Sequence, residues 1–325
     1  MTNPPDMDSR PAKRARTEDE PEPVVRCEEL WYDDGNLVLQ AERTQFRVHR
    51  SILCKQSIVF KDMKEASCTS TGSNTVEGCP VVELQDSAKE IRYMLQCIYD
   101  TGNMHRQPTN TELPLALRMG HKYLISTLFE FAASHMHHFF PSHLADHETD
   151  GFLFDMNDGN PFEFLAIART AGLETVIPAL CLSYIRDLKP DDLAEGVKGQ
   201  MLGPDDGFML LLAHNKILDR ILMYCLEWAL DQHRHPHCVS FAACDHERLE
   251  FRDRLLSEPS LASSVNIEYA FLAAWDDRNL RVKLCPPCKR KAQRMHEQGR
   301  EKFWKDLPTF FGLRPWEELQ DFTIE

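Results

Sequence analysis

The stretch DGNLVLQAERTQFRVHRSILCKQSIVFKDM, residues 34–63, decides the fold of the N-terminal part of the chain. Two short apolar runs, at residues 37–39 and 46–48, are separated by polar residues and follow strand periodicity, so they predict a β-hairpin. Ser51 suits a helix start, and the apolar positions after it recur at helical spacing. These positions are Ile52, Leu53, Ile58, Val59, Phe60 and Met63. A hairpin followed by two short helices is therefore expected.

The residues that follow extend this pattern to about residue 140. Residues 64–80 are polar, rich in Ser, Thr and Gly, and without periodicity, so they predict a loop. Residues 81–84 predict a third strand, and residues 88–99 predict an amphipathic helix. More helix is expected over residues 113–140, ending before Pro141. The sequence thus predicts an α+β domain over residues 27–140.

The order of these motifs resembles a BTB/POZ domain. The resemblance is carried by the Phe-x-Val-His element at residues 46–49, the Ser-x-x-Phe element at residues 57–60 and Val-Glu-Leu at residues 82–84. Together with a basic N-terminal tail and an aromatic segment at residues 302–316, it makes the chain similar to an expanded group of fungal BTB-domain proteins. The resemblance implies a small sheet flanked by helices, with these side chains in the core: Phe46, Val48, Leu53, Phe60 and Leu84.

The same resemblance implies that the domain binds proteins. It places Asp34, His49 and Arg50 at the end of the sheet as candidate interaction residues, and it implies pairing as a homodimer or heterodimer. Family members that recruit cullin-based ubiquitin ligases carry a hydrophobic-x-Glu element after the Ser-x-x-Phe helix. Met63 and Glu65 have these residue types, although they lie earlier than that element usually does. A substrate adaptor that binds a cullin is therefore an alternative function.

Helical periodicity predicts an all-α domain over residues 159–325, after a linker at residues 141–158. Pro161 suits the first turn of one helix, and others are expected over residues 173–188, 207–230 and 289–305. The helix at residues 207–230 is apolar on most sides, which predicts a central core element.

A group of cysteines in this C-terminal part has the spacing of metal ligands. Cys285 and Cys288 have the two-residue gap by which two thiolates hold one tetrahedral zinc ion, and Cys238 and Cys244 would supply the opposite pair. The five residues between Cys238 and Cys244 make the match to known zinc modules imperfect. Unconnected thiols, and so no cofactor, are the first expectation, and a structural zinc ion is the alternative. A redox pair comes last, because the expected βαβ unit is missing from the pattern. The histidines near residues 135–147 are expected at the surface.

Composition sets outer limits on the function. The chain has 325 residues, of which 42% are hydrophobic and 27% charged, as in a folded globular protein. Its net charge of -14 argues against a diffuse attraction to nucleic acid or anionic lipid. No apolar run reaches the roughly 18 residues that span a bilayer, and no secretory signal is seen. Eleven scattered cysteines, an odd number, indicate a reducing compartment.

Residues 1–26 combine prolines with a basic cluster and an acidic run, which predicts a disordered tail. Lys13, Arg14 and Arg16 lie in a segment that looks like a short nuclear-import signal, and a solvated charged tail is the alternative interpretation. The expected location is the nucleus, the cytoplasm or both. A nuclear regulator that acts through partners is a further hypothesis.

The motifs of common catalytic sites are missing from the sequence. It contains no P-loop, no dinucleotide-binding glycine motif and no nucleophile elbow. The chain is therefore expected not to be an enzyme. The leading hypothesis is a regulatory scaffold whose BTB/POZ domain pairs with itself or another chain while the helical domain holds a second partner.

Overall fold

The computed structural model of the chain describes residues 23–67, 74–149, 160–231, 235–257, 273–276 and 280–324. They form two compact units. The first lies within Met1–Ser51 and Thr69–Arg92 and holds the strands. The second lies within Ile52–Cys68 and Tyr93–Glu325 and is built of helices. The predicted α+β arrangement with a helical C-terminal region is confirmed.

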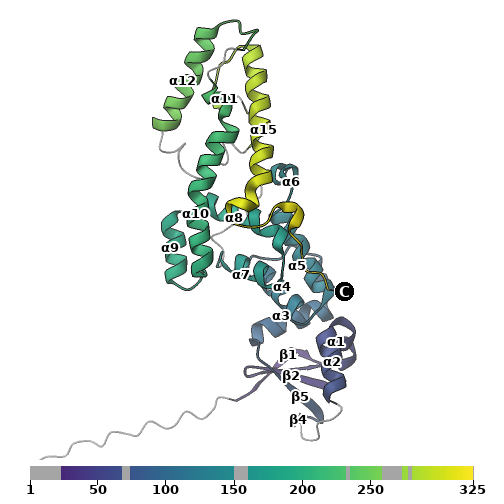
Figure 1. Cartoon of the computed structure of the whole chain (residues 1–325). Helices are drawn as coiled ribbons and strands as arrows, with labels where there is room; N and C mark the ends of the chain where they lie inside the picture. The colour runs from purple at the N-terminus through teal and green to yellow at the C-terminus, as the bar shows by residue number, and fades with distance from the viewer. Residues whose placement is uncertain are drawn as a thin grey trace, which may run out of the picture. The chain divides into compact units, whose positions relative to one another are not determined.

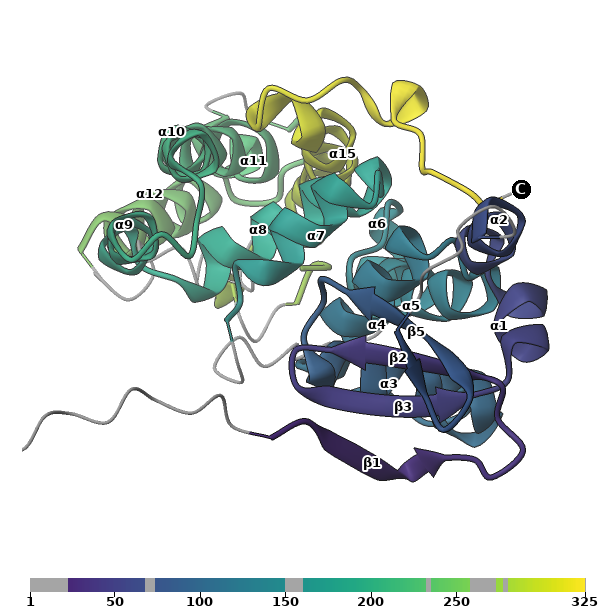
Figure 2. The ribbon, with the colours of Figure 1, turned by 90° about the horizontal axis from the view of Figure 1, so that it is seen from below.

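The first unit contains a five-stranded sheet in the order β1-β3-β2-β5-β4. Figure 2 shows β1, β3, β2 and β5 of this sheet. β2 and β3 form the predicted antiparallel hairpin, in which Leu39 lies opposite Phe46. β5 pairs in parallel with β2, and β1 pairs in parallel with β3. The sequence did not predict β1, whose first two residues fall in the predicted tail. The strands are β1 (Val25–Trp31), β2 (Leu37–Ala41), β3 (Thr44–Val48), β4 (Thr75–Val76) and β5 (Cys79–Leu84).

Alternation along the strands decides which side chains are buried. Phe46 and Val48 have no exposed surface, as the sequence predicted, but Leu84 is only half-buried. Leu84 is the last residue of β5, where the strand ends and the side chain is covered less completely. Glu77 and Gly78 join β4 to β5 with φ values of 50° and 77°. Positive φ at both central residues suits a two-residue hairpin turn.

The helices account for most of the second unit (Figure 1). α2 continues to Ser67, so the loop predicted from residue 64 begins later than expected. α6 lies inside the predicted linker, and α9 and α12 were not predicted. The helices are α1 (Arg50–Gln56), α2 (Ile58–Ser67), α3 (Ala88–Tyr99), α4 (Glu112–Lys122), α5 (Ser126–Phe139), α6 (Leu144–Thr149), α7 (Glu163–Thr170), α8 (Ile177–Asp187), α9 (Pro190–Lys198), α10 (Pro204–Arg220), α11 (Glu227–Leu230), α12 (Phe241–Ser257) and α15 (Pro286–Phe310), with short 3₁₀ turns at Thr101–Met104, Glu174–Val176 and Trp316–Glu318.

The most deeply buried helix of the second unit is α8, in which every residue from Ile177 to Arg186 is buried. The prediction that residues 207–230 form the central element is wrong. That segment divides into α10, a π-helical turn at Ile221–Cys225 and α11. α10 buries one face only, and Phe208 and Leu212 on another face are 65% and 49% exposed. Its many apolar residues are thus divided between the core and the surface.

α15 runs along α10, the π-helical turn and α11 (Figure 1). Phe303 and Leu307 of α15 have no exposed surface. The ring of His296, also fully buried, has its Nδ1 atom 3.0 Å from the carbonyl oxygen of Cys225 in the π-helical turn. α15 therefore provides one long side of the helical core.

The C-terminal residues after α15 contact α4, α5 and the 3₁₀ turn at Glu174–Val176. Asp321 accepts hydrogen bonds from His137 Nε2 on α5 at 2.7 Å, and from the backbone N–H and hydroxyl of Thr175 at 2.9 and 2.6 Å. The Phe322 ring meets those of His121 and Phe129 edge-on, with centroids 5.0 and 5.7 Å away. We call this connection, formed by His137, Thr175 and Asp321, the C-terminal latch.

Candidate functional site

The residues predicted at the end of the sheet lie close together. His49 Nε2 lies 3.0 Å from Asp34 Oδ1, and its ring lies 5.3 Å from that of Tyr32. The hydrogen bond from His49, with one from the Asp34 backbone, holds the pKa of the Asp34 carboxyl below its usual value. Asp34 is 85% exposed. The backbone N–H of Arg50 donates to the Asn36 side chain at 2.9 Å, which fixes the start of α1. Partner binding by these residues stays a prediction.

The Ser-x-x-Phe element has a structural role that explains its residue types. The hydroxyl of Ser57 accepts the backbone N–H of Phe60 at 3.1 Å, which caps α2. It also donates to the carbonyl oxygen of Tyr123 at 2.6 Å. The rings of Phe60 and Tyr123 stack with centroids 5.0 Å apart. This element therefore ties α2 to the end of α4.

The residues singled out for cullin binding both lie on α2. The side chain of Met63 is partly exposed, and Glu65 is helical in its backbone. The residues of the nuclear-import hypothesis, Lys13, Arg14 and Arg16, lie outside the described residues.

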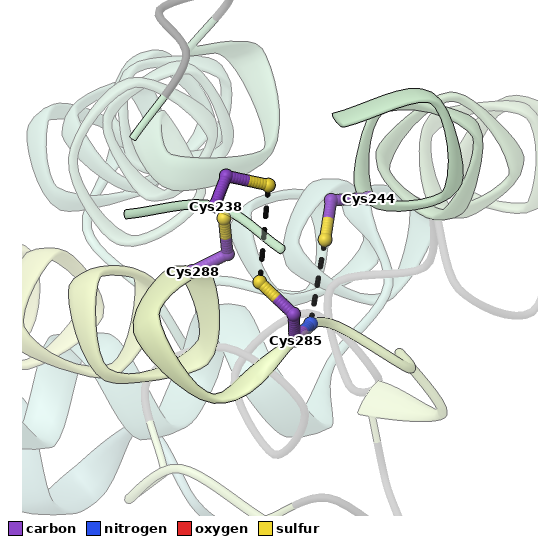
Figure 3. A group of neighbouring side chains, drawn as sticks. All are labelled: Cys238, Cys244, Cys285 and Cys288. Atoms are coloured by element: carbon purple, nitrogen blue, oxygen red, sulfur yellow. Dashed lines mark hydrogen bonds between the residues drawn. The ribbon is translucent and has the colours of Figure 1, made fainter. Parts of the chain in front are cut away.

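Four cysteine sulfurs meet beside the start of α15 (Figure 3). The Sγ atoms of Cys238, Cys244, Cys285 and Cys288 all lie within 4.8 Å of one another. Those of Cys238 and Cys285 are 3.8 Å apart, and the backbone N–H of Cys285 donates to the Cys244 sulfur at 3.3 Å. The structure thus brings together all four residues that the sequence singled out as candidate zinc ligands. We call them the cysteine cluster.

Two helix starts and one loop supply these sulfurs. Cys285 directly precedes α15, and the two prolines after it occupy the first helical positions, where no backbone N–H is needed. Cys288 follows in the first turn of α15. Cys244 lies in the first turn of α12, and Cys238 lies in the loop before that helix.

The thiols of the cluster influence one another's ionisation. Burial acts to raise the pKa of Cys285, but hydrogen bonds from the backbone N–H groups of Cys288 and Val239 and from neighbouring thiols outweigh it, and the pKa falls to about 6. Burial and hydrogen bonding raise the pKa of Cys244 and Cys288. The hydrogen bonds within the cluster thus act in opposite directions on the pKa of Cys285 and on those of Cys244 and Cys288.

The histidines form no metal site in the part of the chain that the structure describes. Among those residues, the cysteine cluster is the one group of three or more Cys, His, Asp or Glu side chains that could share an ion. His143 faces Asp146 at 3.9 Å, whereas the ring of His147 lies 4.8 Å from that of Trp304. Their spacing of four residues thus produces no shared site.

The fold and these contacts define a chain with an α+β N-terminal module, whose motifs have structural roles, and a helical C-terminal region with a cysteine cluster. Residues 31–139 match the family model of the BTB/POZ domain. The chain contains a BTB/POZ domain, a class of module that generally binds proteins and is generally not catalytic. No curated protein and no solved structure matches the chain. Among the described residues, no helix is both long enough and apolar enough to cross a membrane.

Proposed function

We propose that this protein is a regulatory scaffold that pairs with a second copy of itself through its BTB/POZ domain while its helical region holds another partner. The match of residues 31–139 to the BTB/POZ domain carries the proposal, because such domains generally mediate protein–protein interaction and dimerisation. The absence of a catalytic function and the identity of the second partner stay predictions.

The sheet edge formed by β1 is the surface that supports self-association. β1 is the outermost strand of the sheet, and within the described residues no further strand pairs with it. Val25 on this strand is 58% exposed. An edge strand presents unpaired backbone N–H and C=O groups, which are a template for pairing with another chain. A second copy that adds its own β1 would bury both valines.

Changing Val25 to Asp is expected to weaken self-association of the full chain at least tenfold, because the new carboxylate would have to lose water in a strand-to-strand contact. Sedimentation velocity over a concentration series measures the association constant. Met201→Asp is the matched control, since Met201 is 50% exposed and lies outside the BTB/POZ domain. A parent chain that stays monomeric, or equal association of the parent and Val25→Asp chains, would reject this surface.

A cullin-binding adaptor is the second candidate, supported by the position of Met63 and Glu65 together on α2. Changing Glu65 to Lys is expected to lower cullin recovery in co-precipitation at least tenfold, because the charge at the centre of the contact is reversed. Glu83→Lys is the control, because Glu83 is an exposed acidic residue on β5. Unchanged recovery with Glu65→Lys, or none with the parent, would reject the adaptor function.

Nuclear location also stays a prediction. It depends on Lys13, Arg14 and Arg16, and imaging of the tagged chain with these residues changed to alanine would test it.

A further inference from the structure

The dimensions of the cysteine cluster fit a tetrahedral tetrathiolate site. Zinc–sulfur bonds of about 2.3 Å place the sulfurs of a regular tetrahedron about 3.8 Å apart. The sulfurs of Cys238 and Cys285 are 3.8 Å apart, and no pair in the cluster is separated by more than 4.8 Å. An ion would need to draw the more distant sulfurs inward by about 1 Å, which side-chain rotation supplies.

We propose that Cys238, Cys244, Cys285 and Cys288 bind one zinc ion that fastens the start of α12 and the loop before it to the start of α15. Four protein thiolates complete the coordination of zinc and leave no position for a substrate, so the site is structural. Soft sulfur ligands in a tetrahedral arrangement select zinc or iron over magnesium, calcium or manganese.

The surroundings of the cluster suit the charge of such a site, because four thiolates and one Zn²⁺ carry a net charge of −2. The positive end of the α15 dipole lies at Cys285, and the backbone N–H of Cys285 already points at the Cys244 sulfur. Lys289, Arg290 and Lys291 follow Cys288 directly on the same helix. They add positive charge to the first turns of α15, while the backbone N–H of Cys285 orients the Cys244 sulfur.

The packing of α12 shows why a clamp is needed there. The structure describes the side chains of α12 from Phe241 to Arg254. Among these, only Cys244, Arg248 and Phe251 are buried. One aromatic ring is a small apolar contribution to hold a helix of 17 residues in place. Arg248 adds hydrogen bonds to the carbonyl oxygens of Cys244 and Asp231. Glu247 accepts the backbone N–H of Lys283, and Arg254 donates to the carbonyl oxygen of Arg281. The metal would add a direct link from α12 to the start of α15.

A disulfide explains the cluster less well. A disulfide requires sulfurs about 2.05 Å apart and joins two cysteines, whereas here four free thiols converge at distances suited to a common central ion. A redox Cys-x-x-Cys pair also would not require Cys238 and Cys244 to approach from another segment.

The metal content of the purified full chain tests the proposal. Inductively coupled plasma and native mass spectrometry are expected to find one zinc ion per chain in the parent, and less than a tenth of that in Cys288→Ser. Cys54→Ser should keep its zinc, because Cys54 is a partly exposed free thiol outside the cluster. A metal-free parent with four titratable thiols, a disulfide within the cluster, or bound iron, visible by its colour, would each overturn the proposal.

Hydrogen exchange of the parent chain after zinc chelation keeps the test decisive if the serine variant does not fold. Exchange of the backbone amides at residues 241–254 is expected to accelerate at least tenfold, while those of β2 and β3 keep their rates. Restoring zinc should restore protection. Equal exchange rates with and without the chelator would show that the ion, even if bound, does not fasten α12.

Discussion

Changing Gly299 to Ala is expected to lower the free energy of unfolding by about 2 to 3 kcal/mol. A Cβ atom at Gly299 would lie 2.2 Å from the carbonyl oxygen and 2.5 Å from the carbonyl carbon of Tyr224. Both atoms belong to the backbone of the π-helical turn, so a side-chain rotation cannot relieve the contact. α15 and this turn would have to separate, and the buried contacts around Cys225 would loosen.

The sign of this effect makes it a sharp test, because glycine within an exposed helix is normally less stable than alanine by about 1 kcal/mol. Urea denaturation of the full chain measures the change. Gln298→Ala is the control, since Gln298 is the exposed neighbour of Gly299 on α15, and its effect should stay within about 0.5 kcal/mol. A stabilised Gly299→Ala chain would show that the helices do not approach as described.

Local periodicity sufficed for the parts of the fold whose contacts are close in sequence. The hairpin of β2 and β3 needs only alternating side chains and a two-residue connection, and α3 was predicted at its observed bounds. β1 was missed because its charged residues, Arg26, Glu28 and Glu29, interrupt the apolar pattern and only Cys27 and Leu30 are buried. It pairs in parallel with β3, and β2 lies between them in sequence, so no hairpin pattern marks it.

Apolar content misled the prediction where burial depends on neighbouring helices. α10 is rich in leucine, isoleucine and methionine, yet it exposes Phe208 and Leu212. α8 has a shorter apolar run but is covered on every side. A sequence pattern reports which faces can be buried, while the number of neighbouring helices decides which of them are.

The cysteine cluster was predictable in part because its ligand types are rare and chemically specific. Cys285 and Cys288 have a recognisable gap, but Cys238 and Cys244 do not match a known module. α12, which carries Cys244, has too narrow a buried stripe to be recognised as a helix from periodicity. The C-terminal latch gave no signal at all, since His137 and Asp321 are separated by 184 positions in sequence.

Removing the carboxylate of the C-terminal latch by Asp321→Ala is expected to lower the free energy of unfolding by about 2 kcal/mol near pH 5.5, with a smaller loss near pH 8.5. The hydrogen bond from His137 disappears together with both from Thr175. His137 is 43% exposed and Asp321 is 20% exposed, so solvent screens the ion pair and keeps its contribution well below that of a buried one.

The pH dependence follows from two opposite shifts. The hydrogen bond to Asp321 raises the pKa of His137 in the folded protein. The contribution of protonated His137 to the free energy of unfolding is therefore complete below its ordinary pKa of about 6.5. It is lost as the pH rises through the raised pKa of the folded protein. Burial acts to raise the pKa of Asp321, but hydrogen bonds from His137 and Thr175 outweigh it and lower the pKa. The contribution of the Asp321 carboxylate to the free energy of unfolding is present above its ordinary pKa of about 3.9. It is lost as the pH falls through the lowered pKa of the folded protein.

The latch should thus stabilise the fold most between about pH 4 and 6.5. Urea denaturation of the parent and Asp321→Ala chains at pH 5.5 and 8.5 measures this difference. Glu317→Ala, an exposed acidic residue of the same segment, should change stability equally little at both values. A loss of the same size at both pH values would assign the whole effect to the Thr175 contacts, which do not titrate, and would leave His137 without a role in the latch.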